Sequence, residues 1–305
     1  MRAGFLGLLL AASLASASPA WATLRVLAST SDLAALAVAV GGDLVHVEAI
    51  VPSGADPEAF EVRPRDGERL RQADLVVRVG LGYDYWLDAL VNRVGDRRFA
   101  PGGAAYVDAS KGIALLEIHG QSVVNEGGHA HGVANPHYWL DPANAVIITA
   151  AILEGLARVS PKQSDRFKAN RDRFLAELER RQAQWTGMLQ PFAGVKLIAY
   201  HNSWPYFARR FRLDIVDYIE PRPGIAPSPA RLAQLIARGR AAGVRAVVHE
   251  PYQPEESSQL VADRLGVPLL RLALSAGSVG GAGDYIALID HDVTVLALAL
   301  RSPPR

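Results

Sequence analysis

The stretch "SPKQSDRFKANRDRFLAELERRQAQWTGMLQP" (residues 160–191) predicts one long helix near the middle of the chain. Its apolar stripe consists of Phe167, Phe174, Leu178, Trp185 and Leu189. Ser160 and Pro161 mark the start of the helix, and Pro191 ends it. About thirty residues with a rise of about 1.5 Å each give a length of roughly 45 Å. Such a helix can cross a whole molecule, so we expect residues 159–191 to connect two halves of the chain.

On both sides of this helix, short strand-like runs alternate with helical patterns. The strands are expected at Leu24–Ala28, Val45–Val51, Leu75–Val79, Tyr106–Asp108, Lys196–Tyr200, Asp214–Ile219, Ala246–His249 and Pro268–Leu272. The helices are expected at Asp32–Val40, Arg65–Gln72, Tyr83–Val94, Trp204–Phe211, Ser228–Ala242, Glu255–Leu265 and Asp284–Leu300. This alternation is typical of parallel α/β sheets. We therefore predict an α/β protein with two (β/α)4-type lobes, residues 23–158 and 192–305, joined by the long helix.

The first residues, "MRAGFLGLLLAASLASASPAWA", have the pattern of a secretory signal peptide covering residues 1–22. One positive charge precedes an apolar run, and the segment ends on the small residues that flank Trp21. The chain contains no cysteine, which excludes disulfides, thiol catalysis and a lipid-modified N-terminal cysteine. With 32 basic and 31 acidic residues, the charge balance gives no reason to expect nucleic acid as a partner. We expect a soluble periplasmic protein that is not lipid-anchored.

Residues 117–134 form a Gly- and His-rich segment with His119, His129 and His131. Loops of this length in compact domains are usually functional. These histidines are expected to be exposed to solvent, without a fixed role as ligands.

Metal-ligating side chains recur where strands end and helices begin. Parallel sheets bind their ligands at this edge. The candidates are Glu58, His137, His201, Glu220 and Asp284. Imidazoles together with carboxylates suit Zn²⁺, Mn²⁺ or Fe²⁺. Each residue also has a structural interpretation: Asp284 is a suitable helix N-cap, the glutamates could be solvated loop residues, and the histidines could be hydrogen-bonded in the core.

Sequence signatures of enzymes are missing. His249-Glu250 begins like HExxH, but Gln253 stands where the second histidine would be. The chain has neither a G-x-S-x-G elbow nor a P-loop, and Gly80 and Gly82 lack the third glycine of a dinucleotide fingerprint. These observations favour a binding protein over a catalyst.

Six ordered motifs resemble the periplasmic solute-binding proteins of zinc and manganese ABC transporters, the TroA-like family. They are "VPSGADPEAFEVRPRD", "NPHYWLDPANA", "YHNSWPYFARRF", "IEPRPGIAPSP", "EPYQPEESSQLVADRLGVPLL" and "GDYIALIDHDV". The resemblance implies two α/β lobes, a connecting helix and a metal ion held between the lobes. It places histidine ligands on His137 and His201 and an acidic ligand on Asp284, with Glu220 as an additional or alternative ligand.

The chain departs from this family in the opening motif. The family usually reads D-P-H, with the histidine as a ligand, whereas this chain reads Asp56-Pro57-Glu58. Either Glu58 coordinates the metal or the site is open and weaker, and we favour coordination because Glu is a competent ligand. The carboxylates favour Mn²⁺ or Fe²⁺, but the His-rich loop and the Irving–Williams order favour Zn²⁺. We therefore predict zinc, rather than Mn²⁺ or Fe²⁺, as the transported ligand.

The sequence thus predicts a monomeric periplasmic protein that delivers a divalent metal ion to an ABC-type membrane permease. Two other functions remain open. One is a metal-dependent hydrolase with an open coordination position, and the other is a surface adhesin or metal buffer without a permease.

Overall fold

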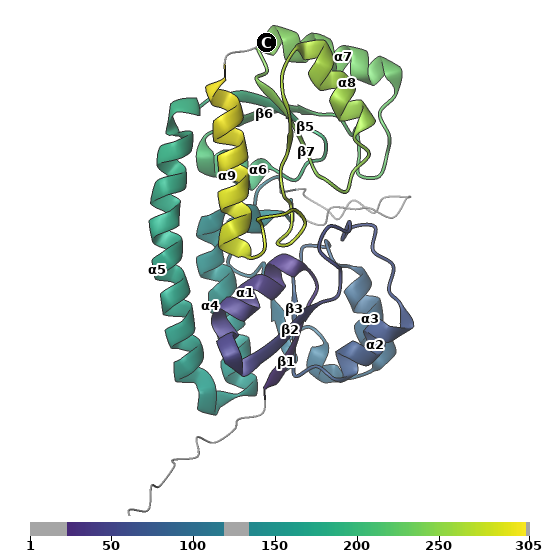
Figure 1. The fold of residues 1–305 in the computed structure, drawn as a ribbon. Coiled ribbons are helices and arrows are strands. Elements are labelled where there is room, and N and C mark those ends of the chain that lie inside the picture. Colours follow the sequence, from purple (N-terminus) through teal and green to yellow (C-terminus); the bar gives the residue numbers. More distant parts are fainter. Residues whose placement is uncertain (1–22, 119–133, 303–305) are drawn as a thin grey trace, which may run out of the picture.

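The computed structural model describes residues 23–118 and 134–302, and Figure 1 shows their arrangement. The predicted signal peptide (1–22) lies outside the described residues. So does the part of the Gly/His segment that carries His119, His129 and His131.

The N-terminal lobe contains a four-stranded parallel sheet with the strand order β2-β1-β3-β4. Its strands are β1 (Leu24–Ala28), β2 (Val45–Ala49), β3 (Leu75–Arg78) and β4 (Tyr106–Asp108). Its helices are α1 (Ser31–Gly41), α2 (Pro64–Arg71), α3 (Trp86–Val94) and α4 (Ala145–Val159). Strand β3 is buried along its whole length, as its unbroken apolar run "LVV" requires of a central parallel strand.

The C-terminal lobe repeats this arrangement with a second four-stranded parallel sheet, in the order β6-β5-β7-β8. Its strands are β5 (Lys196–Ala199), β6 (Asp214–Tyr218), β7 (Ala246–His249) and β8 (Leu269–Arg271). Its helices are α6 (Pro205–Phe211), α7 (Pro229–Ala242), α8 (Glu256–Leu265) and α9 (Tyr285–Arg301). The predicted fold class is confirmed: two parallel-sheet lobes with a long helix between them.

The long helix α5 spans Ser164–Leu189 and runs along both lobes (Figure 1). It has 26 residues, fewer than the stretch quoted above, because a 3-10 turn replaces α-helix at each end (Pro161–Gln163 and Gln190–Phe192). Its apolar stripe packs against α1 and α4 in the first lobe and against α9 in the second. The helical stretch Pro142–Val159, which includes α4, is apolar enough to cross a membrane by length and composition, but α4 packs in this core against α1 and α5.

A single hydrophobic core runs through both lobes. Residues of the N-terminal lobe, such as Val26 and Leu33, belong to the same buried cluster as Leu288 and Ile289 of α9. Each sheet also has one smaller cluster of its own, between the sheet and its outer helices. The lobes are therefore joined by packing as well as by the chain.

A short segment after β8, Ala273–Ala276, passes between the lobes and is held by two buried carboxylates. The backbone N–H of Ala273 donates to Asp292 Oδ1 of α9 at 2.7 Å, and that of Ala276 donates to Asp32 Oδ1 of α1 at 2.9 Å. The indole of Trp139 donates to the Leu274 carbonyl at 3.1 Å. We call this stretch the crossover segment.

Candidate metal centre

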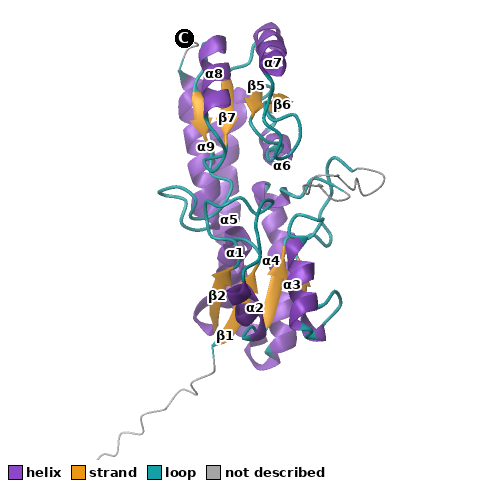
Figure 2. Cartoon of the chain, turned by 90° about the vertical axis from the view of Figure 1, so that its right-hand side faces the viewer, coloured by secondary structure: helices purple, strands orange, loops and turns teal. Residues whose placement is uncertain are grey.

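Three predicted ligands meet between the lobes, where loops from both sheets face each other (Figure 2). Glu58 lies on the loop between β2 and α2, His137 on the segment before α4, and His201 two residues after the end of β5. One ligand atom from each lies within 4.8 Å of the others. Glu58 Oε1 is 3.5 Å from His137 Nε2 and 3.5 Å from His201 Nε2.

These separations match those of donors that share one small cation. Donors at about 2.0–2.1 Å in a tetrahedral site are about 3.3–3.4 Å apart. In an octahedral site with bonds of about 2.1 Å, neighbouring donors are only about 3.0 Å apart. The observed 3.5 Å is nearer the tetrahedral value. The cluster can therefore hold a divalent ion after small side-chain movements.

His137 is fully buried and oriented by Asn135. Asn135 Oδ1 accepts a hydrogen bond from the backbone N–H of His137 at 3.0 Å and lies 3.2 Å from its Nδ1. The rings of Tyr83 and Trp139 pack against the imidazole, each with a centroid separation of 5.3 Å. Because Nδ1 is engaged by an acceptor, Nε2 is the atom available as a ligand, the usual arrangement in metal sites.

His201 is oriented in the same way by a carboxylate. Its Nδ1 lies 2.5 Å from Glu220 Oε2, and the other Glu220 oxygen accepts the backbone N–H of Gly224 at 2.6 Å. Burial lowers the pKa of His201, but the charge of Glu58 and the hydrogen bond to Glu220 outweigh it and hold the pKa well above its usual value. A metal ion must therefore displace a proton from this ring.

A cavity of about 70 Å³ adjoins the cluster, and its lining comes from both lobes. Asp56 and Glu58 line one side, while His201, Glu220 and Tyr252 line the other. Asp56 Oδ1 accepts the backbone N–H of Glu58 at 2.8 Å, which fixes the turn that carries the ligand. About 10–15 Å³ of such space is enough for one water, so the cavity has room for an ion with bound water.

The remaining two candidates, Glu220 and Asp284, differ in their distance from the cluster. Glu220 is placed behind His201, as a partner of the distal ring nitrogen. Asp284 is exposed, and its carboxylate caps α9 by accepting the backbone N–H of Ala287 at 2.8 Å. It lines a different surface pocket, with Arg181 and His291. The geometry gives no support to Asp284 as a ligand of this cluster, and its N-cap interpretation agrees with the structure.

Sequence reasoning missed two residues near the site, Asn135 and Glu250. Asn135 also donates from Nδ2 to the Asn202 carbonyl at 2.9 Å, so it ties the His137 segment to the residue after His201. Glu250 is fully buried and accepts the indole N–H of Trp204 at 2.7 Å; burial raises the pKa of this glutamate. The signal for Asn135 was its position two residues before His137 in "NPH".

Two parallel-sheet lobes with a buried cluster of two histidines and a carboxylate between them define a metal-binding solute-binding protein. Residues 26–299 match the family described as "Zinc-uptake complex component A periplasmic", ZnuA, and the chain belongs to this family. It is therefore a periplasmic metal-binding component of ABC transport, a class that works with a membrane permease and an ATPase, and not an enzyme.

Relatives in this family are named for different metals. The high-affinity zinc uptake system protein ZnuA of Yersinia pestis is 28% identical over 253 residues, covering 74% of this chain and 76% of that protein. The iron ABC transporter substrate-binding lipoprotein MtsA of Streptococcus pyogenes serotype M1 is 23% identical over 252 residues, covering 81% and 78%. Among solved structures, the "138-173 ZnuA deletion mutant plus zinc bound" superimposes with a TM-score of 0.77 at 30% identity, covering 92% of this chain and all of that one.

Proposed function

We propose that this protein captures Zn²⁺, in preference to Mn²⁺ or Fe²⁺, through Glu58, His137 and His201 and delivers it to its permease. The observation that carries this proposal is the convergence of Glu58 Oε1 on both Nε2 atoms at 3.5 Å. Three protein donors leave one tetrahedral position for water, a coordination that zinc accepts readily. Mn²⁺ prefers more oxygen ligands, and it stands below zinc in the Irving–Williams order.

The residues around the cluster have supporting roles in this proposal. Glu220 and Asn135 fix the orientations of the two imidazoles, and the carboxylate of Glu220 raises the basicity of His201 as a ligand. The chain belongs to a family of binding proteins for transport, which weighs against a hydrolase.

We further propose that the mature protein is a soluble monomer. The relative MtsA is named a lipoprotein, whereas this chain has no cysteine that could carry a lipid. The predicted signal peptide would be removed during export.

A competitive metal titration of untagged protein, with elemental analysis of the purified sample, tests the proposal. We expect zinc to displace manganese and iron at a stoichiometry of about one ion per chain. Glu58→Ala should weaken zinc binding, while Glu61→Ala, which removes an exposed carboxylate from the same loop, should not. Equal zinc affinity in all three proteins would show that Glu58 is not a ligand. Delivery is tested by zinc-limited growth of a strain that lacks the gene.

A further inference from the structure

The loop that carries Glu58 is fastened to helix α3 by one side chain, Trp86. The indole N–H of Trp86 donates to the carbonyl of Pro57 at 3.0 Å, directly before Glu58 in the chain. The Trp86 ring also packs on Phe60, with centroids 4.9 Å apart. Both Trp86 and Pro57 are buried, so water does not readily replace this hydrogen bond.

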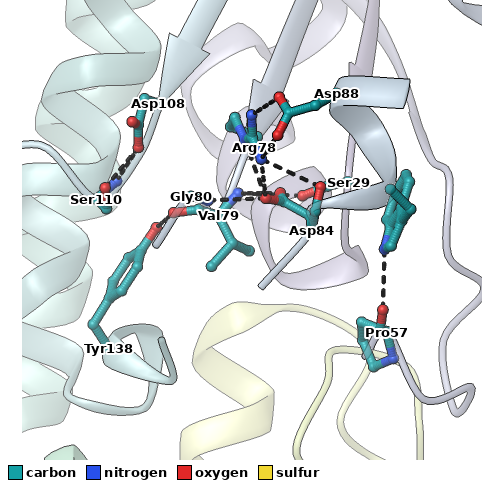
Figure 3. A network of polar contacts seen from close by, with 11 residues as sticks. Ser29, Pro57, Arg78, Val79, Gly80, Asp84, Asp88, Asp108, Ser110 and Tyr138 are labelled. Carbon is teal, nitrogen blue, oxygen red and sulfur yellow. Dashed lines mark hydrogen bonds and ion pairs between the residues drawn. The ribbon is translucent and has the colours of Figure 1, made fainter. Parts of the chain in front are cut away.

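The start of α3 is itself anchored to strand β3 by the polar network in Figure 3. The Asp84 carboxylate accepts the backbone N–H groups of Val79 at 2.7 Å and Gly80 at 3.1 Å. Arg78, on β3, donates to Asp84 at 3.1 Å and to Asp88 of α3 at 2.5 Å. The backbone that carries Trp86 is therefore held in place by these hydrogen bonds.

The same segment, residues 79–86, also contacts the surroundings of His137, the second proposed ligand of this lobe. The hydroxyl of Tyr138, next to His137 in the chain, donates to the Val79 carbonyl at 2.7 Å, a contact visible in Figure 3. The ring of Tyr83 packs edge-on against His137. Residues 79–86 thus set the position of His137 through Tyr83 and Tyr138, and that of Glu58 through Trp86.

We propose that Trp86 is a positioning residue for Glu58, which sets where its carboxylate stands relative to the two Nε2 atoms and thereby tunes metal affinity. This inference rests on the proposed function. The Glu58 side chain has three rotatable bonds, so the position of its carboxylate depends on how firmly the loop fixes its backbone. Groups that orient a metal ligand are commonly worth about 10–100-fold in affinity.

The matched variant is Trp86→Phe, which keeps an aromatic ring against Phe60 and removes the N–H donor. With Zn²⁺ as the probe and a competing chelator, we expect its affinity to fall by about 10-fold or more. The control is Trp185→Phe, which removes an indole hydrogen bond to Asp290 (3.0 Å) in the contact of α5 with α9, outside the cluster. Zinc affinity should be unchanged in the control.

A double-mutant cycle separates positioning from a general loss of structure. In a Glu58→Ala background, Trp86→Phe should have little further effect, because the ligand that it positions is gone. An equal loss in both backgrounds, or unchanged zinc affinity of Trp86→Phe alone, would overturn the inference. Should Trp86→Phe not fold, site-specific replacement of Trp86 by benzothienylalanine keeps the bicyclic shape without the N–H, and the same criteria apply. Wild-type protein that binds no zinc would instead overturn the proposed function.

Discussion

We expect the stability of the metal-free protein to fall with rising pH because of the buried carboxylate of Asp32. Burial raises the pKa of Asp32 to about 7, against the opposing hydrogen bonds from the Ala276 and Asp32 backbone and from Ser275. The second carboxylate of the crossover segment, Asp292, is also fully buried, and its pKa is raised well above its usual value by burial, with a smaller contribution from the charge of Asp32. Within the described residues, Oδ2 of Asp32 has no hydrogen-bond partner.

The magnitude follows from the pKa of Asp32. Its native pKa is above its unfolded value, so the folded state binds the proton more tightly, and stability falls as the pH rises towards the native pKa. A rise in the Asp32 pKa from 3.8 to about 7 on folding corresponds to a total change of about 4 kcal/mol in the free energy of unfolding. Between about pH 5 and about pH 8.5, about 3 kcal/mol of this should be lost.

The substitution Asp32→Asn removes this titration and retains an oxygen for the Ala276 N–H. We compare the free energies of unfolding of variant and wild type by urea denaturation. As the pH rises across that range, the variant should gain about 3 kcal/mol relative to the wild type. The exposed Asp214, changed to Asn, serves as the control and should follow the wild-type profile. Parallel profiles for Asp32→Asn and wild type would refute the assignment of this pH dependence to Asp32.

Three further outcomes follow from the site. Glu220→Gln should weaken zinc binding by about 10-fold and lower the pKa of His201, which NMR titration of the ring can follow; an unchanged pKa would contradict the role of Glu220. As the pH is lowered, zinc affinity measured by chelator competition should fall, and the fall should already begin at a pH above 6.5, the ordinary pKa of histidine. The reason is that the raised pKa of His201 lets protons compete with zinc at a higher pH. A zinc affinity that does not change with pH would contradict this. Because one core joins the lobes, the radius of gyration from X-ray scattering should be the same with and without zinc, and a change of about several ångströms would exclude that expectation.

Much of the fold could be predicted from sequence because its signals are local. The stripe from Phe167 to Leu189 and the alternation of strands and helices are encoded in residues close along the chain. The convergence of Glu58, His137 and His201 could be predicted because parallel sheets bring such loops to one edge. The sequence could not decide the role of Asp284, because an aspartate at the start of a helix has the same signature whether it caps the helix or coordinates a metal ion.

The supporting residues could not be found in this way, since their roles depend on contacts between distant segments. Trp86 reaches Pro57, 29 positions earlier, and Asn135 reaches Asn202, 67 positions later. Nothing in the sequence near either residue indicates its partner. The direction in which Glu220 points, toward the distal nitrogen of His201, likewise depends on tertiary packing.

The core that runs through both lobes has a consequence for the order in which the protein matures. Helix α9, the last element of the chain, supplies Leu288 and Ile289 to the same interior as β1 and α1, the first elements. The lobes therefore lack their finished contact until the C-terminus is available, although Glu58, His137 and His201 all precede it. We expect an incompletely synthesised or exported chain to be a poor chelator. Metal capture would then be reserved for chains that are complete through α9.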